Sequence, residues 1–436
     1  MKSVRVIGAG LAGCEAAWQI ANHGIAVELI EMKPKKMTAA HKTSLFAELV
    51  CSNSLKASRI DSAAGLLKEE MRRLGSVCLP AADQAGVAAG GALAVDRDIF
   101  SQEITKKIKE HPLITVVEEV VEELDIDQYT VIATGPLTDR ALADHLSQLL
   151  DEKHLSFYDA AAPIVSAESI NYDKVFTASR YAFEEEMSSG DYINCPMNKE
   201  EYEAFYEALI TAEGAPLHEF DREMTVYEGC MPIEALAKRG HDSIRFGPMK
   251  PVGLRDPRTG HRPWAVVQLR RENAAGTLYN LVGFQTNLKF PEQKRVFSMI
   301  PGLENAEFMR YGVMHRNTFI SSPKVLSRDL SFKKHPKLFV AGQLSGVEGY
   351  MESAASGIVA GINVVRKMNG QEPLVLPDFT MIGALLSYIC CYEGKDFQPM
   401  GANFGVLPPL NELIKDKRQR YGALSARSLK WYDSLE

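Results

Sequence analysis

Apolar residues in the first part of the chain follow the order strand, helix, strand. An apolar strand at 4–7 precedes a helical segment at 15–21, and a second apolar strand follows at 26–30. Three glycines separate the first strand from the helix: Gly8, Gly10 and Gly13. This order and this glycine spacing are typical of a dinucleotide-binding β-α-β unit.

Each position of this turn has a physical reason. Gly8 permits the tight turn, Gly10 lets a pyrophosphate approach the backbone, and Gly13 lets the helix pack on the strand. Ala9, Leu11 and Ala12 complete the turn, and the helix N-terminus offers free N–H groups and a partial positive charge. Glu31 ends the second strand, where a carboxylate accepts hydrogen bonds from ribose hydroxyls. We therefore expect a bound dinucleotide here.

The following segment continues the alternation of helices and strands. Helical spacing at 61–74 and 99–111 is followed by apolar strands at 114–121 and 129–133. The last strand runs into Ala-Thr-Gly, which returns the backbone to the cofactor in many FAD proteins. Gly135 is therefore predicted as a second cofactor contact.

From about residue 157 the pattern changes to prolines, tyrosines and short alternating runs, with a helix near 200–211. This predicts a mixed, largely antiparallel sheet. The strand–turn–helix pattern returns at 338–360, and its small residues at 354–357 are expected to admit a flat ring system. Gly342 and Gln343 form the turn, although flavoproteins commonly have Asp at the position of Gln343. Three nucleotide-facing segments favour FAD over NAD as the resident cofactor.

The predicted fold class is α/β, with an FAD-binding Rossmann-like domain of the glutathione-reductase type and an inserted α+β domain. We place the first part of the FAD domain at 1–155 and the inserted substrate domain at 156–325. The second part follows at 326–436 and ends in a basic helical tail.

Composition favours a soluble globular protein, since 46% of the 436 residues are apolar and 24% are charged. The longest nearly apolar run, 379–392, is shorter than the ~20 residues that span a bilayer. Because the first strand begins at Val4, we expect no signal peptide and a cytoplasmic location. The seven cysteines contain no CxxC pair, so neither disulfides nor a metal site is predicted.

The net charge of −7 hides two basic stretches. Residues 238–263 hold seven Lys or Arg against two Asp, and residues 415–430 hold six against one Asp. Such patches fit a polyanionic partner, but ordinary solvated surface charge explains them equally well.

Several longer motifs occur together: GAGLAG at 8–13, ELVCSNSLKAS around Cys51, GGALAVDR at 90–97, EGCMPIE around Cys230, FGPMKPVGL at 246–254 and AGQLSGVEGYMESAASG at 341–357. In this order they resemble the folate- and FAD-dependent tRNA uracil-5-methyltransferase family. The resemblance extends from end to end of the chain.

The resemblance implies that a methylene carbon from methylenetetrahydrofolate is passed to carbon 5 of the T-loop uridine of tRNA. FAD supplies the reducing equivalents and is recharged by NADPH or NADH. It implies no stable protein partner, and the short apolar runs already predict no membrane span.

Two cysteines match family motifs that carry this chemistry, because a thiolate must add to carbon 6 of uracil before carbon 5 can react. We expect Cys230 to be the nucleophile and Cys51 to assist, although the two roles could be reversed. Buried structural thiols are the alternative for both. Tyr350 matches a family aromatic that stacks on the flavin, and its alternative is a packed core tyrosine.

The remaining candidates are less specific. His315 and Arg316 could bind folate or phosphate, and Glu228 and Glu348 are candidate proton acceptors. The other cysteines, 14, 78, 195, 390 and 391, are expected in the core. The two basic stretches, together with Arg270 and Arg271, are the predicted docking surface for tRNA.

Three other functions fit parts of the sequence. A related FAD enzyme modifies the wobble uridine of tRNA, but it is substantially longer than this chain. A small-molecule flavin oxidoreductase would leave the basic stretches incidental. A flavin-dependent RNA-binding module without catalysis would leave Cys51 and Cys230 without a role.

Overall fold

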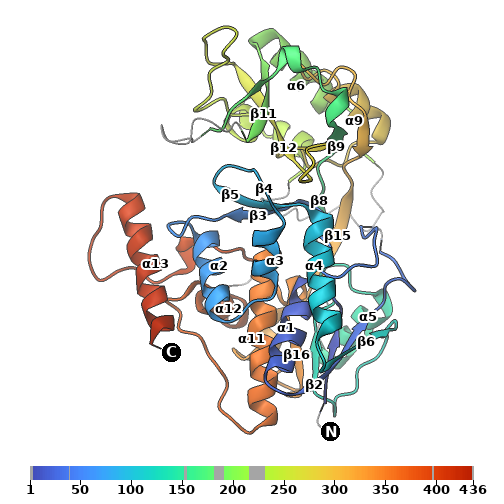
Figure 1. Cartoon of the computed structure of the whole chain (residues 1–436), viewed down its shortest axis with the longest axis vertical. Coiled ribbons are helices and arrows are strands. Elements are labelled where there is room, and N and C mark those ends of the chain that lie inside the picture. The colour runs from blue at the N-terminus through green and yellow to red at the C-terminus, as the bar shows by residue number, and fades with distance from the viewer. Residues whose placement is uncertain are drawn as a thin grey trace.

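The computed structural model describes residues 3–38, 40–151, 155–180, 191–215, 231–394 and 397–434, with the backbone alone at 155–159 and 315–316. Two large hydrophobic cores organise these residues. In Figure 1 the larger core occupies the lower part of the molecule together with both termini, and the smaller core stands above it.

Five parallel strands form the central sheet of the larger core, in the order β16-β7-β1-β2-β6. They are β1 (Ser3–Ile7), β2 (Ala26–Glu31), β6 (Ile114–Glu118), β7 (Thr130–Ile132) and β16 (Leu338–Val340). The strands β7 and β16 are buried along their whole length, as expected for a parallel sheet covered on both faces. The predicted fold class is confirmed.

Two helices of this core cross in direct backbone contact, α1 (Leu11–Asn22) and α11 (Tyr350–Met368). A Cβ placed on Gly357 would stand 2.2 Å from the Ala12 carbonyl oxygen, and one on Gly361 would stand 2.8 Å from the Ala16 carbonyl oxygen. The small residues at 354–357, expected to admit a flat ring, are instead buried, with Gly357 against α1.

Other helices surround these two, with a small antiparallel sheet at the top of the larger core. They are α2 (Ala63–Arg73), α3 (Cys78–Gln84), α4 (Arg97–Glu110), α5 (Arg140–Leu150), α10 (Ser322–Val325), α12 (Met381–Cys391) and α13 (Lys417–Asp433), with β3 (Ser54–Ala57), β4 (Gly86–Val87) and β5 (Ala92–Val95). The helix expected at 99–111 begins earlier, because the Asp96 side chain accepts from the N–H groups of Asp98 and Ile99.

The smaller core is built on a six-stranded antiparallel sheet in the order β10-β11-β12-β13-β9-β14. The strands are β9 (Ile164–Ser166), β10 (Phe176–Thr177), β11 (Tyr192–Met197), β12 (Ala265–Arg271), β13 (Leu278–Leu281) and β14 (Phe308–Arg310). Its helices are α6 (Lys199–Thr211), α7 (Ile233–Ala237), α8 (Ser243–Phe246) and α9 (Phe290–Phe297).

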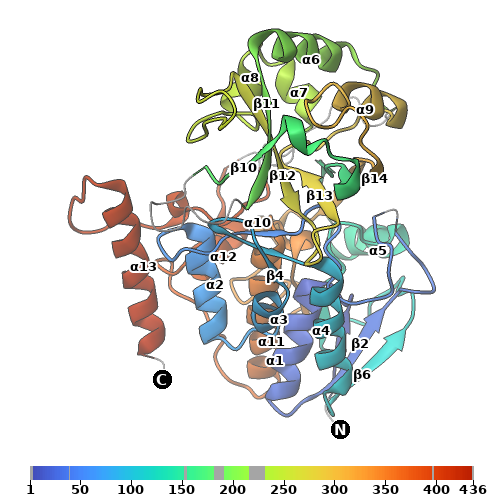
Figure 2. The same ribbon diagram turned by 45° about the horizontal axis from the view of Figure 1, so that its top comes forward.

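The chain passes between the two cores through one pair of antiparallel strands, β8 (Leu155–Ala160) and β15 (Met314–Phe319). In Figure 2 the strands β12 and β13 stand over the larger core. The boundaries at 155 and 325 stay a prediction. None of the helices within the described ranges combines the length and the apolar character needed to cross a bilayer.

A buried carboxylate joins three helices at the side of the larger core. Glu70 of α2 accepts the N–H groups of Met381 and Ile382, at 2.7 and 2.8 Å, at the start of α12. It also accepts the hydroxyl of Ser428 in α13 at 2.5 Å. Burial raises the pKa of Glu70 to about 7. The hydrogen bonds favour the charged form and lower the pKa, but the effect of burial is larger.

This pKa predicts a pH-dependent stability. Between about pH 4.5 and pH 7 the folded state binds more protons at Glu70 than the unfolded state does, so the free energy of unfolding falls as the pH rises. The contribution is about 3 kcal/mol in total. Denaturant unfolding at several pH values should show this fall in the wild type and a flatter profile in Glu70→Gln. Parallel profiles for the two proteins would contradict the assignment.

Candidate active site

The turn between β1 and α1 is held by contacts that leave no room for a side chain at Gly8 or Gly13. Gly8 has a φ of 98°, and its N–H donates to the Ile30 carbonyl at 2.7 Å. A Cβ on Gly13 would stand 1.8 Å from the Gly8 carbonyl oxygen, so α1 packs directly on the turn. The N–H of Ala9 donates to Glu31 Oε2 at 2.7 Å. The turn therefore ties the ends of β1 and β2 together.

A cleft opens beside this turn, at the carboxyl ends of the parallel strands. Three segments far apart in the sequence line it, and they contain nine of the eleven predicted cofactor contacts: Gly8, Gly10, Leu11, Ala12, Glu31, Gly135, Gly342, Gln343 and Tyr350. The other two lie behind the wall, where Ala9 holds Glu31 and Gly13 packs on Gly8.

The wall of the cleft fits a dinucleotide such as FAD. A Cβ on Gly10 or on Gly135 would meet no atom within 4 Å, so both positions face open space. The helix α1 starts after Gly10 without a side-chain cap, which leaves its first N–H groups for a pyrophosphate. Glu31 is buried and also accepts the Lys33 N–H at 3.0 Å, so its carboxylate is fixed at the edge of the cleft.

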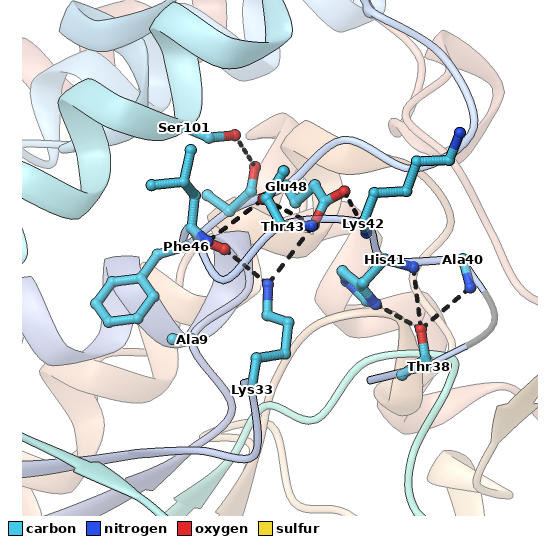
Figure 3. Close-up of polar contacts among 12 residues, drawn as sticks. Ala9, Lys33, Thr38, Ala40, His41, Lys42, Thr43, Phe46, Glu48 and Ser101 are labelled. Atoms are coloured by element: carbon cyan, nitrogen blue, oxygen red, sulfur yellow. Dashed lines mark hydrogen bonds and ion pairs between the residues drawn. The ribbon is translucent and has the colours of Figure 1, made fainter. Parts of the chain in front are cut away.

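The loop after β2 forms a further part of the wall that the sequence did not single out (Figure 3). Glu48 accepts the N–H groups of Lys42 and Thr43, at 2.9 and 3.2 Å. The buried Lys33 donates to the Leu45 carbonyl at 2.6 Å and lies 3.8 Å from Glu48. The signal that could have identified this loop was its start immediately after the strand that ends in Glu31.

One of the two predicted catalytic cysteines, Cys51, lies beside the cleft and contacts a residue of its wall. Tyr350, the first residue of α11, lines the cleft, and its hydroxyl oxygen lies 2.9 Å from Cys51 Sγ. The same oxygen accepts the N–H groups of Cys51 and Ser52, at 2.9 and 3.2 Å. Burial, followed by the neighbouring Cys51, raises the pKa of Tyr350 well above its usual value. The tyrosine therefore stays a protonated phenol.

Three arginines hold the segment around Cys51, and sequence reasoning missed this arrangement. Arg97 donates to the Leu49 carbonyl at 2.7 Å, and Arg310 donates to the Val50 carbonyl at 2.6 Å. Arg270 donates to Ser52 Oγ at 3.0 Å and to Asn53 Oδ1 at 2.9 Å. Two of these arginines come from the smaller core, so both cores build this site.

The pKa values of these arginines reflect their crowding. Burial lowers the pKa of Arg270, and burial together with the charge of Arg97 lowers the pKa of Arg310. Burial also acts to lower the pKa of Arg97, but the negative charge of Glu272 outweighs it, so the pKa of Arg97 lies above its usual value. Glu272 binds Arg97 through both oxygens, at 2.8 and 3.2 Å.

Arg270 was predicted to dock tRNA, and this prediction is wrong. Its side chain is buried and bonded to Ser52 and Asn53, because its position in β12 turns it toward the larger core. Arg271, the next residue along the strand, is exposed.

Gln343 occupies the position at which flavoproteins commonly have Asp. Its amide donates to the carboxylate of Glu348, a candidate proton acceptor that is buried and lies behind the turn. Glu228 and Cys230 lie outside the described residues. The side chains of His315 and Arg316 also lie outside, since only their backbone is described in β15.

The remaining cysteines divide into two groups. Cys14, Cys78, Cys195 and Cys390 are buried as expected, and burial raises the pKa of each thiol. Cys391 is exposed, because it stands on the solvent side at the last turn of α12, so its expected place in the core is wrong. Among the described residues, no three His, Cys, Asp or Glu side chains gather into a possible metal site.

The glycines of the turn predict two different mutant phenotypes. Gly10→Val should fold normally, because its side chain enters open space, but it should lose bound FAD because that space belongs to the cofactor. Gly13→Val should lose stability instead, because its side chain collides with the Gly8 carbonyl. The absorbance of flavin after purification and the melting temperature measure the two effects. Full flavin content in Gly10→Val would contradict this assignment of the cleft.

Comparison with known proteins finds relatives that match this chain over nearly its whole length. Residues 3–372 match the family described as "Glucose inhibited division protein A". The chain is 58% identical to "Methylenetetrahydrofolate--tRNA-(uracil-5-)-methyltransferase TrmFO" of Halalkalibacterium halodurans, over 98% of this chain and 97% of that protein. The protein of the same name from Desulfitobacterium hafniense is also 58% identical, with the same coverage.

Among solved structures, the chain resembles Aquifex aeolicus GidA in its form I crystal, with a TM-score of 0.70 and 19% identity. The match covers 99% of this chain and 76% of that chain, and it shows a shared fold. The identity to the two bacterial relatives over nearly the whole length is far higher. This chain therefore belongs to the methylenetetrahydrofolate--tRNA-(uracil-5-)-methyltransferase TrmFO family.

Proposed function

We propose that this chain forms 5-methyluridine in the T-loop of tRNA, with methylenetetrahydrofolate as the carbon donor and reduced FAD as the reductant. NADPH or NADH recharges the flavin. The observation that carries the proposal is the Cys51 thiol, which lies 2.9 Å from a tyrosine of the cleft wall in a chain 58% identical to relatives with this activity in their name.

The residues of the cleft have separate tasks in this reaction. The N-terminus of α1 and Gly10 hold the pyrophosphate, and Glu31 holds a ribose. Tyr350 fixes the Cys51 segment beside the cleft through its hydroxyl. FAD, when bound, supplies the electrons that reduce the transferred carbon to a methyl group.

The uracil ring requires a sulfur nucleophile and a proton acceptor. Carbon 5 is a poor nucleophile until a thiolate has added to carbon 6, and its proton must leave after the new carbon is attached. We assign the role of nucleophile to Cys230 and that of assisting thiol to Cys51. The alternative assignment has the two roles reversed. Cys51 is half-buried and contacts Tyr350 of the cleft wall, which supports its part in this assignment.

A groove on the smaller core supports the docking of tRNA. Trp264 lines it, with the Arg245 guanidinium 3.8 Å from its ring centre, and Phe246 beside it is 72% exposed. Arg258 and Arg262 also line the groove, within the basic stretch 238–263. Cations interleaved with aromatic rings suit the phosphates and bases of RNA. The second basic stretch, 415–430, stays a predicted contact on α13.

The strand β12 connects this groove to the reactive site. Trp264 precedes its first residue, and Arg270, six residues later, binds the Cys51 segment. Six residues of extended strand span about 20 Å. The tRNA can therefore rest on the groove while one flipped uridine reaches the cleft. Because tRNA is the substrate, we also propose a cytoplasmic location, without a membrane or a stable protein partner.

The other functions are less well supported. The wobble-uridine enzyme is longer, whereas this chain and its TrmFO relatives match over nearly their whole lengths. An oxidoreductase for small molecules gives the basic groove no role, and a non-catalytic RNA-binding module gives Cys51 no role.

Purified protein with unmodified tRNA, labelled methylenetetrahydrofolate and NADPH should place label in uracil methyl groups. We expect Cys51→Ala to lower this rate about 100-fold or more, because it removes a reacting thiol but no part of the nucleotide turn. Cys391→Ala, which removes an exposed thiol on α12, is the matched control and should keep full activity. NADPH oxidation on a small substrate without tRNA labelling would favour the oxidoreductase.

Trapping with fluorouridine-containing RNA separates the two cysteines. The covalent adduct should form with Cys51→Ala and disappear with Cys230→Ala. The reverse pattern would exchange the two roles.

The groove predicts a salt-dependent binding defect. Arg262→Gln should weaken tRNA binding for all sequences and lower the slope of log Kd against log salt by about one, because one phosphate contact is lost. Lys106→Gln removes a charge from another exposed position, on α4, and should keep the wild-type slope. An unchanged slope in Arg262→Gln would remove the groove from the docking surface.

A further inference from the structure

The segment around Cys51 is surrounded by an excess of buried positive charge. Three guanidinium groups hydrogen-bond residues 49–53, and each of them interacts electrostatically with Cys51 itself. They come from α4, β12 and β14. We call Arg97, Arg270 and Arg310 the arginine cluster.

One carboxylate, Glu272, interacts with all three members of the arginine cluster. It is 4% exposed and engages Arg97 through both of its oxygens. Three positive charges and one negative charge leave a net positive field at the Cys51 segment. A buried positive field of this kind stabilises a nearby anion.

The hydroxyl of Tyr350 adds a second, directional contribution. A phenol has one proton to donate and two lone pairs to accept with. The lone pairs are used by the N–H groups of Cys51 and Ser52, at 2.9 and 3.2 Å. The one hydroxyl proton is therefore left for Cys51 Sγ, at 2.9 Å, so the sulfur is the acceptor. A hydrogen bond donated to sulfur favours its charged form.

From these two observations we infer that the arginine cluster and Tyr350 hold Cys51 as a thiolate at neutral pH, with Glu272 moderating the field. The proton of the thiol goes to solvent, and no oxidant or reductant takes part. These four residues are positioning and electrostatic residues for the reaction. The inference rests on the proposed function in one respect, namely that Cys51 takes part in methyl transfer as nucleophile or as proton acceptor.

Other charged groups nearby act in the same direction or are more remote. Lys42, in the loop of the cleft wall, interacts with Arg97 and Arg310 and adds positive charge. Glu48 offsets Lys42, and Tyr192 of β11 faces Arg270 from the smaller core. Lys42 and Tyr192 therefore act on members of the arginine cluster, and Glu48 acts on Lys42.

Thiol alkylation measured against pH tests this directly. The holoenzyme as purified is treated with iodoacetamide from pH 5 to pH 10, and alkylation of the Cys51 and Cys391 peptides is followed by mass spectrometry. Cys391 is exposed and serves as the internal reference. The midpoint for Cys51 should lie at least one pH unit below the value of about 8.5 of an ordinary cysteine. Equal midpoints for the two cysteines would overturn the inference.

Charge variants distinguish an electrostatic role from a packing role. Arg310→Gln should raise the Cys51 midpoint and slow alkylation at pH 7 about three- to tenfold, whereas Arg310→Lys should restore the wild-type midpoint. Glu272→Gln should shift the midpoint downward. If these side chains acted through packing alone, Arg310→Gln and Glu272→Gln would shift the Cys51 midpoint in the same direction. That result would contradict the inference.

Tyr350→Phe removes the donated hydrogen bond and should also raise the midpoint. If an arginine variant fails to fold, the wild-type midpoint and Tyr350→Phe still decide the question. The measurement uses neither tRNA nor folate. The two assays can therefore fail independently. If the protein proves not to transfer methyl groups, the Cys51 midpoint can still be low, and if the midpoint proves normal, methyl transfer can still be detected.

Discussion

The close approach of α1 to its neighbours is the constraint on which the cleft depends. Three missing side chains permit it: Gly13 against the Gly8 carbonyl, Gly357 against the Ala12 carbonyl and Gly361 against the Ala16 carbonyl. Because α1 and α11 touch backbone to backbone, the first residue of α11 is fixed relative to the nucleotide turn. That residue is Tyr350, so the same packing that shapes the phosphate end of the cleft also places the hydroxyl that binds Cys51.

Buried carboxylates repeat one structural device in the larger core. Glu15 accepts the N–H groups of Val77 and Cys78, at 3.0 and 3.1 Å, and Glu70 likewise accepts two backbone N–H groups from a distant segment. Glu31 accepts one N–H from the turn, at Ala9, and one from Lys33, two residues further along its own segment. Each pair of bonds offsets the cost of burying the acid and ties separate elements together. Of the three carboxylates, Glu31 lines the cleft, whereas Glu15 and Glu70 connect elements away from it.

The smaller core contributes side chains to the segment around Cys51. Its sheet carries Arg270 and Arg310 to the Cys51 segment, and Glu272 follows directly after β12. Burying three arginines is costly unless hydrogen bonds and countercharge compensate, and here the bonds to residues 49–53 supply the compensation. The sheet of the smaller core is therefore joined to the Cys51 segment by side-chain hydrogen bonds.

Local sequence was sufficient for the nucleotide turn, the parallel strands and the fold class, because glycine spacing and apolar periodicity act over a few residues. The resemblance to a known family brought Cys51 and Tyr350 forward, two residues that are 299 positions apart. Tertiary structure alone decided that these two meet, that Arg270 points inward, that Cys391 is exposed and that Gly357 packs on α1. Such contacts depend on sheet order and helix crossing, which bring together residues that no local pattern relates.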